Sequence, residues 1–249
     1  MDRQPKNIKS KSFIYDLARK RKGFLPGLLT SGSLFISFYS IISTINGEYR
    51  IAAIMIIIAA FLDAFDGRVA RFMNSSSDFG GQYDSLADVI GFGVAPAILI
   101  YSQSAEQWGD FGISIAFVYM ACCCVRLARF ASDSDEGTKD FRGMPSPTAG
   151  GFVASTIWLL EIYPTETTFA LYFSGLACLA AGLLMVSNLP FISGRRFILF
   201  NNHKISVSAV VVIFYFAILA IKPAEVIFFS ACLYIVMAAV SGIKMKSNN

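Results

Sequence analysis

Charged residues are scarce in this chain of 249 residues. Only 15% are Asp, Glu, Lys or Arg, whereas soluble domains carry about a quarter. Hydrophobic residues make up 55% of the sequence, and the mean hydropathy is positive. Long apolar runs recur along the whole length. This composition excludes an ordinary soluble domain and predicts an all-α polytopic membrane protein.

Metal-binding thiols and imidazoles are also nearly missing. The sequence has one histidine, His203, and its five cysteines lie in apolar runs without metal-ligand spacing. A zinc site and a disulfide framework are therefore both disfavoured. We interpret the cysteines as small apolar residues of buried helices.

The apolar runs predict about eight transmembrane helices, since one crossing takes about 20 residues. Their continuity favours helices over a β-barrel, whose strands would show short alternating segments. The predicted spans are 26–45, 51–72, 83–104, 111–130, 148–163, 167–188, 205–221 and 224–243.

The distribution of basic residues predicts the orientation of these spans. With both termini on one side of the membrane, every lysine and arginine except Arg50 and Lys222 falls on that side. Loops rich in Lys and Arg face the cytoplasm, so both termini are expected there. Residues 1–25 are basic, with apolar residues at helical spacing, and we expect them to lie on the membrane surface.

One charged segment, "DAFDGRVARFMNSSSDFGGQYDSLAD" (63–88), lies between two apolar runs. The run before it, Ile51–Leu62, has 12 residues. At 1.5 Å per residue this is too short to cross a hydrocarbon core of about 30 Å, so the helix must continue into the charged segment. The apolar run after the segment, Val89–Tyr101, is also too short, so its helix must begin within the charged segment. Ionisable groups at such depth are costly and indicate a functional site.

Four aspartates in this segment are spaced so that they can converge. Asp63 and Asp66 are three residues apart, and Asp84 and Asp88 are four apart, so each pair shares a helical face. A short Ser- and Gly-rich connection places the two helices side by side. Carboxylates without Cys or His select a hard divalent cation, and four of them could hold two ions that act on a pyrophosphate. The alternatives are a salt-bridge cluster that only fixes packing and an ion or proton pathway.

The segment also resembles a known family. Eight residues match the signature of the CDP-alcohol phosphotransferases: Asp63-x2-Asp66-Gly67-x2-Ala70-Arg71-x8-Gly80-x3-Asp84-x3-Asp88. The resemblance implies a six-helix catalytic core that opens to the cytoplasm. It also implies that an alcohol displaces CMP from a CDP-linked substrate with the help of two divalent cations. Ligation by carboxylates alone selects Mg²⁺, Mn²⁺ or Ca²⁺ for these ions.

The resemblance assigns roles to these residues. It gives Asp63, Asp66 and Asp84 to the metals, and makes Asp88 a metal ligand, a general base or both. A carboxylate fits the base role because the acceptor hydroxyl must lose its proton to become a good nucleophile. The CDP moiety would be bound by Asp66, Gly67, Ala70, Arg71, Gly80 and Asp84. The small residues among these allow close approach, and Arg71 can contact a phosphate oxygen.

Further stretches narrow the resemblance to bacterial and archaeal phosphatidylserine synthases within that family. They are "SDFGGQYDSLADVIGFGVAPA" (77–97), "RLARF" (126–130), "FRGMPSPTAGG" (141–151) and "LMVSNLPF" (184–191). One departure is Gly91, where such proteins often carry Ser. The resemblance implies CDP-diacylglycerol as donor and L-serine as acceptor. One of Arg126, Arg129 and Arg142 could bind the serine carboxylate, or these residues could serve only topology and headgroup contacts.

Several alternatives stay open at this stage. The acceptor could instead be glycerol 3-phosphate, inositol phosphate or choline, and a different class of function is a divalent-cation transporter. We expect three parts: the basic segment 1–25, a catalytic transmembrane core 26–190, and a C-terminal pair of helices 191–249. The resemblance further implies a homodimer in the cell membrane, and no nucleic-acid partner is expected.

Overall fold

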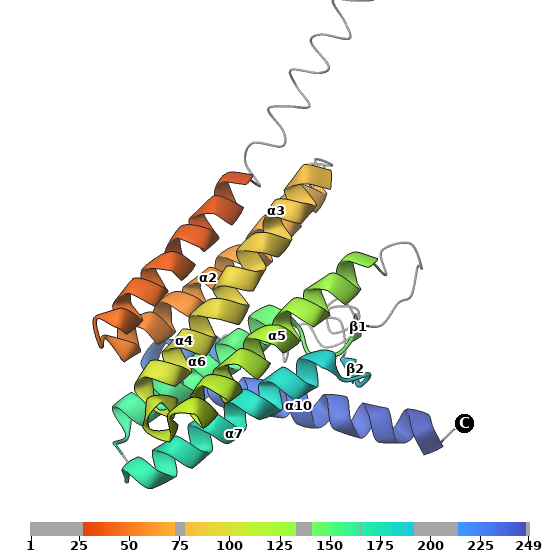
Figure 1. Ribbon diagram of the computed structural model, residues 1–249. Helices are drawn as coiled ribbons and strands as arrows, with labels where there is room; N and C mark the ends of the chain where they lie inside the picture. The colour runs from red at the N-terminus through yellow and green to blue at the C-terminus, as the bar shows by residue number, and fades with distance from the viewer. Residues whose placement is uncertain (1–26, 73–77, 133–140, 165, 192–213, 248–249) are drawn as a thin grey trace, which may run out of the picture.

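The computed structural model describes residues 27–72, 78–132, 141–164, 166–191 and 214–247 of the chain, and these residues are mainly helical (Figure 1). The helices are the first helix Gly27–Ile45, α2 Tyr49–Phe72, α3 Asp78–Asp88, α4 Ala95–Gln103, α5 Asp110–Ser132, α6 Ser146–Ile162, α7 Thr167–Val186 and α10 Pro223–Ser247. Residues 214–221, just before α10, are also helical. The predicted helical architecture is confirmed for the described residues.

The third predicted span is a single rod with a wide turn in its middle. A π-helical turn, Val89–Val94, joins α3 to α4, and the N–H of Ala95 bonds the carbonyl of Ile90, five residues back. A 3₁₀ turn, Ala105–Trp108, and Gly109 with φ of 55° then lead into α5. The hydropathy of this span predicts a continuous helix and gives no sign of the π-helical turn.

Five described helices are long and apolar enough to cross a membrane: Gly27–Ile45, Phe79–Gln103, Asp110–Ser132, Thr168–Val186 and Pro223–Gly242. Helices α2 and α6 also lie at predicted spans, but α2 carries several charges and α6 has only 17 residues. A multi-pass membrane protein is thus supported. The count of eight spans and the cytoplasmic termini stay predictions, and residues 1–25 lie outside the described part.

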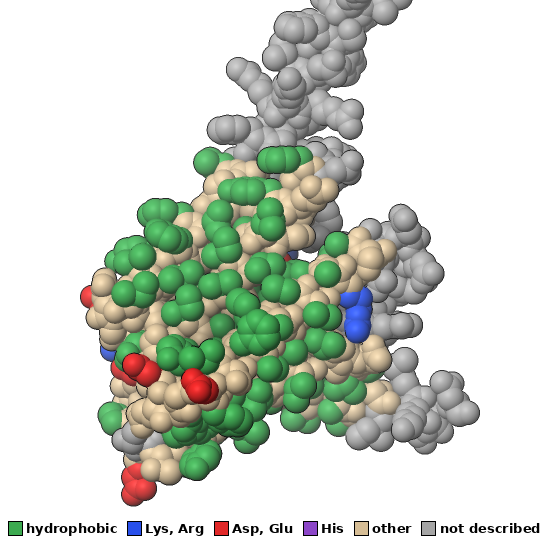
Figure 2. Space-filling view, in the orientation of Figure 1, with side chains coloured by type: hydrophobic (Ala, Val, Ile, Leu, Met, Phe, Trp, Pro, Cys, Tyr) green, Lys and Arg blue, Asp and Glu red, His purple; other side chains and the backbone are tan. Residues whose placement is uncertain are grey.

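Helix α6 lies at the centre of the bundle. It packs against α2, α7 and α10, and its residues from Ala149 to Trp158 are all buried. Small residues in this stretch allow the neighbouring helices to approach closely, as is common in membrane bundles. On the outside, Phe35, Phe117 and Leu176 are each more than half exposed. Figure 2 shows hydrophobic side chains spread over most of the face in view, as expected for a surface in contact with lipid, with acidic side chains at its lower left.

One short β pairing accompanies the helices and leaves the predicted all-α class unchanged. Two short strands, β1 Phe141–Arg142 and β2 Pro190–Phe191, pair in antiparallel fashion. Gly143 follows β1 with φ of 84°, and its N–H donates to the carbonyl of Leu189 at 3.0 Å. A Cβ at Gly143 would lie 2.3 Å from the carbonyl oxygen of Met185, so only glycine fits. The pairing connects the loop before α6 to the end of α7, which hydropathy cannot reveal.

Candidate active site

Three of the predicted aspartates form one cluster. Asp63 and Asp66 lie in the second half of α2, and Asp84 lies in α3. One carboxylate oxygen from each residue lies within 4.8 Å of the others. The convergence predicted from the helical spacing is therefore present in the structure.

Asp88, the last residue of α3, joins this cluster. Its carboxyl group lies close enough to those of Asp63 and Asp84 to interact with both. Carboxylates packed in this way repel one another unless a cation or a proton lies between them. The π-helical turn begins immediately after Asp88, and such turns are frequent at functional sites.

The donor set fits a divalent cation. The cluster offers carboxylate oxygens, which are the ligands that Mg²⁺, Mn²⁺ and Ca²⁺ prefer. Asp66 is only 3% exposed, and burying a charged carboxylate is unfavourable without a charged partner or hydrogen bonds. A bound cation would supply the missing charge. The clustered residues thus agree with the predicted metal ligands, while their roles stay predictions.

Sequence reasoning missed a residue that orients this cluster. The hydroxyl of Thr30, in the first helix, donates a hydrogen bond to Oδ2 of Asp66 at 3.0 Å. Beside it, the hydroxyls of Ser31 and Tyr83 lie 2.9 Å apart and connect the first helix to α3. Thr30 gave no distinct signal, because hydroxyl residues recur along this helix and can bond their own backbone, as Ser37 and Thr44 do.

The predicted CDP-binding residues are only partly described. Gly67 follows Asp66 in α2, and its backbone N–H lies near the Asp66 carboxylate. Gly80 lies in α3, half-buried, one turn before Asp84. The side chains of Ala70 and Arg71 lie outside the described part. The CDP-binding role of the whole set therefore stays a prediction.

The predicted acceptor arginines lie in two different environments. Arg126 is close enough to Asp63 and Asp88 to attract both, and its Nη1 donates to the hydroxyl of Ser146 at 2.7 Å. Arg129 instead donates from Nη1 to the carbonyl of Val186 at 3.3 Å, at the end of α7. The side chain of Arg142 lies outside the described part.

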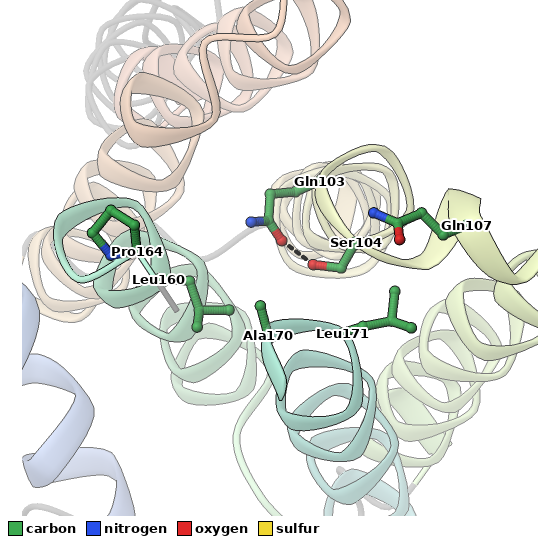
Figure 3. A pocket seen from close by; sticks show the side chains of 7 residues that line it. All are labelled: Gln103, Ser104, Gln107, Leu160, Pro164, Ala170 and Leu171. Atoms are coloured by element: carbon green, nitrogen blue, oxygen red, sulfur yellow. Dashed lines mark hydrogen bonds between the residues drawn. The ribbon is translucent and has the colours of Figure 1, made fainter. Parts of the chain in front are cut away.

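A separate pocket lies at the other end of the long rod formed by α3 and α4. It is lined by Gln103, Ser104, Gln107 and four apolar side chains, and encloses about 180 Å³ (Figure 3). The Ser104 hydroxyl donates to the Gln103 side chain. At 1.5 Å per residue, Gln103 is roughly 20 Å along the rod from Asp88. Its lining is uncharged, so this pocket does not suit a pyrophosphate.

A helical membrane bundle that buries an aspartate cluster between two neighbouring helices is typical of a metal-dependent membrane enzyme. Residues 23–189 match the model of the CDP-alcohol phosphatidyltransferase family, and the chain belongs to this family. The resemblance found in the sequence is thereby confirmed, and the chain is a transferase of phospholipid biosynthesis.

Relatives with assigned activities support a narrower grouping. The CDP-diacylglycerol–serine O-phosphatidyltransferase of Helicobacter pylori (strain ATCC 700392 / 26695) is 31% identical over 215 residues, 85% of this chain and 87% of the relative. The enzyme of the same name from Bacillus subtilis (strain 168) is 36% identical over 127 residues, 51% of this chain and 71% of the relative. An archaetidylserine synthase of Methanothermobacter thermautotrophicus is 35% identical over 169 residues, 67% of this chain and 69% of the relative.

Proposed function

We propose that the protein transfers the phosphatidyl group of CDP-diacylglycerol to the hydroxyl of L-serine, giving phosphatidylserine and CMP. The observation that carries the proposal is the convergence of Asp63, Asp66 and Asp84, with Asp88 beside them, in a member of this family. Serine as the acceptor is supported by the names of the relatives, two of which are serine O-phosphatidyltransferases and one an archaetidylserine synthase.

The aspartates divide the chemical work. Asp63, Asp66 and Asp84, and Asp88 where it also ligates, would hold two divalent cations, Mg²⁺ or Mn²⁺ and alternatively Ca²⁺. When bound, these cations neutralise the pyrophosphate and stabilise the charge on departing CMP. Asp88 accepts the proton of the serine hydroxyl as the new oxygen–phosphorus bond forms and the bond from phosphorus to the CMP oxygen breaks.

The surroundings of the cluster are assigned on the same basis. Gly67, Ala70 and Gly80 would admit the nucleotide, with Arg71 on a phosphate oxygen. We place the site at the cytoplasmic face, in the core of residues 26–190, so that the lipid tails of the donor stay in the bilayer. A homodimer in the cell membrane, implied by the family resemblance, belongs to the same proposal.

The acceptor can be tested directly. Purified protein in lipid nanodiscs receives CDP-diacylglycerol, Mn²⁺ or Mg²⁺, and one of serine, glycerol 3-phosphate, inositol phosphate or choline. We expect CMP release with serine only. The relatives reported above are named either for transfer to serine or for the synthesis of archaetidylserine. The measurement is CMP formed per minute, with identification of the lipid product by mass spectrometry.

Two outcomes would contradict this proposal. Release of CMP with a different acceptor would keep the reaction class and reassign the alcohol. No release with any acceptor, together with uptake of Mn²⁺ into sealed vesicles, would favour the divalent-cation transporter. A transporter would need the ion to leave on the far side, where the described pocket beside Gln103 is lined by uncharged residues.

Arg126 is the arginine that we expect to bind the serine carboxylate. A guanidinium has five N–H donors, so Arg126 can bond Ser146 and a carboxylate together. Arg126→Gln should raise the KM for serine about tenfold, the cost of one charge-assisted hydrogen bond, with a smaller effect on the KM for CDP-diacylglycerol. Arg129→Gln should change the serine KM much less, because Arg129 bonds the end of α7. Equal effects of both variants on the serine KM would contradict this assignment.

A further inference from the structure

The π-helical turn Val89–Val94 joins two helices with different roles, α3, which carries two of the aspartates, and α4, which packs in the core. Before it, α3 carries Asp84 and Asp88 of the cluster. After it, α4 presents Ala95, Leu99 and Ile100 to the core, where each is fully buried. One extra residue in a turn rotates a helix by about 100°. The wide turn therefore sets the rotation of the aspartates relative to the half of the rod that is fixed in the core.

The wide turn is held by a buried tyrosine from α5. The hydroxyl of Tyr119 donates to the backbone carbonyl of Phe92 at 2.9 Å. Tyr119 is fully buried and Phe92 is 1% exposed. A buried hydroxyl needs a partner, and here the partner is the main chain of the turn itself. The bond thus fixes the middle of the turn to a neighbouring helix.

Close packing holds the same turn from other sides. A Cβ at Gly150, in α6, would lie 3.2 Å from Cδ1 of Phe92, so the two helices meet closely at this glycine. On the side of the first helix, a Cβ at Gly91 would lie 2.6 Å from the Ser37 hydroxyl oxygen. This contact gives a physical reason for glycine at position 91, because a side chain there would displace Ser37.

We propose that Tyr119 is a positioning residue for the aspartate cluster, acting through Phe92 to hold the wide turn and thereby the rotation of Asp84 and Asp88. The expected change in kcat rests on the function proposed above, whereas the expected change in Mn²⁺ affinity does not. Tyr119 itself does not touch the reacting atoms. Its role is to keep the carboxylates where they can bind cations and accept a proton.

The test compares two tyrosines that differ in place but not in chemistry. Tyr49 donates to the carbonyl of Ser102 at 3.0 Å, so it also fixes the rod, but at the end away from the aspartates. Tyr119→Phe should lower kcat about tenfold and weaken Mn²⁺ binding about tenfold, with little change in the KM for CDP-diacylglycerol. Tyr49→Phe should leave kcat and Mn²⁺ affinity near the wild-type values.

A second pair of variants perturbs the turn without removing a hydroxyl. Gly150→Ala should press on Phe92 and lower both kcat and Mn²⁺ affinity. Gly151→Ala, its neighbour in α6, should have little effect, since a Cβ there meets nothing within 4 Å among the described residues. Thermal unfolding of all four variants would show whether each is folded.

The readouts separate the two proposals. Mn²⁺ affinity is measured by direct titration of the purified protein, which needs no turnover. If the wild type binds Mn²⁺ but releases no CMP with serine, the proposed function fails and the titration alone judges the role of Tyr119. If Tyr119→Phe matches Tyr49→Phe in both Mn²⁺ affinity and kcat, or if the wild type binds no Mn²⁺, the inference is overturned.

Discussion

Asp88→Asn should lower kcat about a thousandfold at saturating divalent cation, while the affinity for the CDP-linked substrate stays largely unchanged. The amide has the size of the carboxylate but cannot accept the proton of the serine hydroxyl. General bases contribute about a hundred- to ten-thousandfold to such reactions. Asp88 is the appropriate target because it interacts with Asp63 and Asp84 and lies within reach of the positive charge of Arg126. The measurement is CMP release under steady-state conditions, with nucleotide binding measured separately.

Two matched variants test whether the lower kcat of Asp88→Asn comes from loss of the carboxylate at this position. Asp110→Asn makes the same chemical change at an exposed aspartate that begins α5, at the far end of the bundle from the cluster, and should leave the rate unchanged. Asp88→Glu keeps a carboxylate but displaces it, and should retain partial activity. A near-normal rate for Asp88→Asn would remove the base role. A rate restored by more Mn²⁺ would make Asp88 chiefly a metal ligand.

Removal of divalent cations should abolish turnover. Four carboxylates at such close range repel one another without a cation or protons between them, so the cluster cannot order a pyrophosphate by itself. Exhaustive chelation should bring CMP release below detection, and Mg²⁺ or Mn²⁺ should restore it. Full turnover after chelation would end the metal proposal.

A variant that weakens metal binding without removing a ligand tests whether the cation binds at this aspartate cluster. Thr30→Val keeps the shape of the side chain but removes the hydrogen bond to Asp66. Loss of a partner that orients a metal ligand costs about ten- to a hundredfold in metal affinity. The Mn²⁺ concentration for half-maximal rate should rise by at least about tenfold. Ser85→Ala is the control, since the Ser85 hydroxyl bonds the carbonyl of Gly81, one turn earlier in the same helix, rather than an aspartate. If both variants need the same Mn²⁺ concentration for half-maximal rate, Thr30 does not orient a metal ligand.

The sequence was sufficient to predict the aspartate cluster because the prediction depends only on residues that are close together in the chain. Two apolar runs too short to span a membrane forced Asp63, Asp66, Asp84 and Asp88 into helices, and spacings of three and four placed each pair on one face. The short connection between the two helices then predicted that the two pairs converge, as Asp63, Asp66 and Asp84 do. Each of these steps uses only residues within about two dozen positions, so no knowledge of the remaining helices was needed.

Contacts between distant segments were not predictable in the same way. Arg126 and Arg129 looked equivalent from their spacing, but in the structure Arg126 bonds Ser146 within electrostatic range of Asp88, whereas Arg129 bonds the end of α7. Which face of a helix meets which neighbour depends on how the whole bundle packs. The pairing of β1 with β2 belongs to the same class, because it joins residues almost fifty positions apart.

Composition, hydropathy and short spacings were enough to predict a helical membrane protein and the four carboxylates, because they are properties of neighbouring residues. The family followed from the resemblance of residues 63–88 to a known signature. The tertiary structure decided which side chains hold these carboxylates in place. Thr30 comes from the first helix and Tyr119 from α5, and neither stands out among the many hydroxyl and aromatic residues of an apolar chain. Their importance arises from the positions that packing gives them next to Asp66 and Phe92.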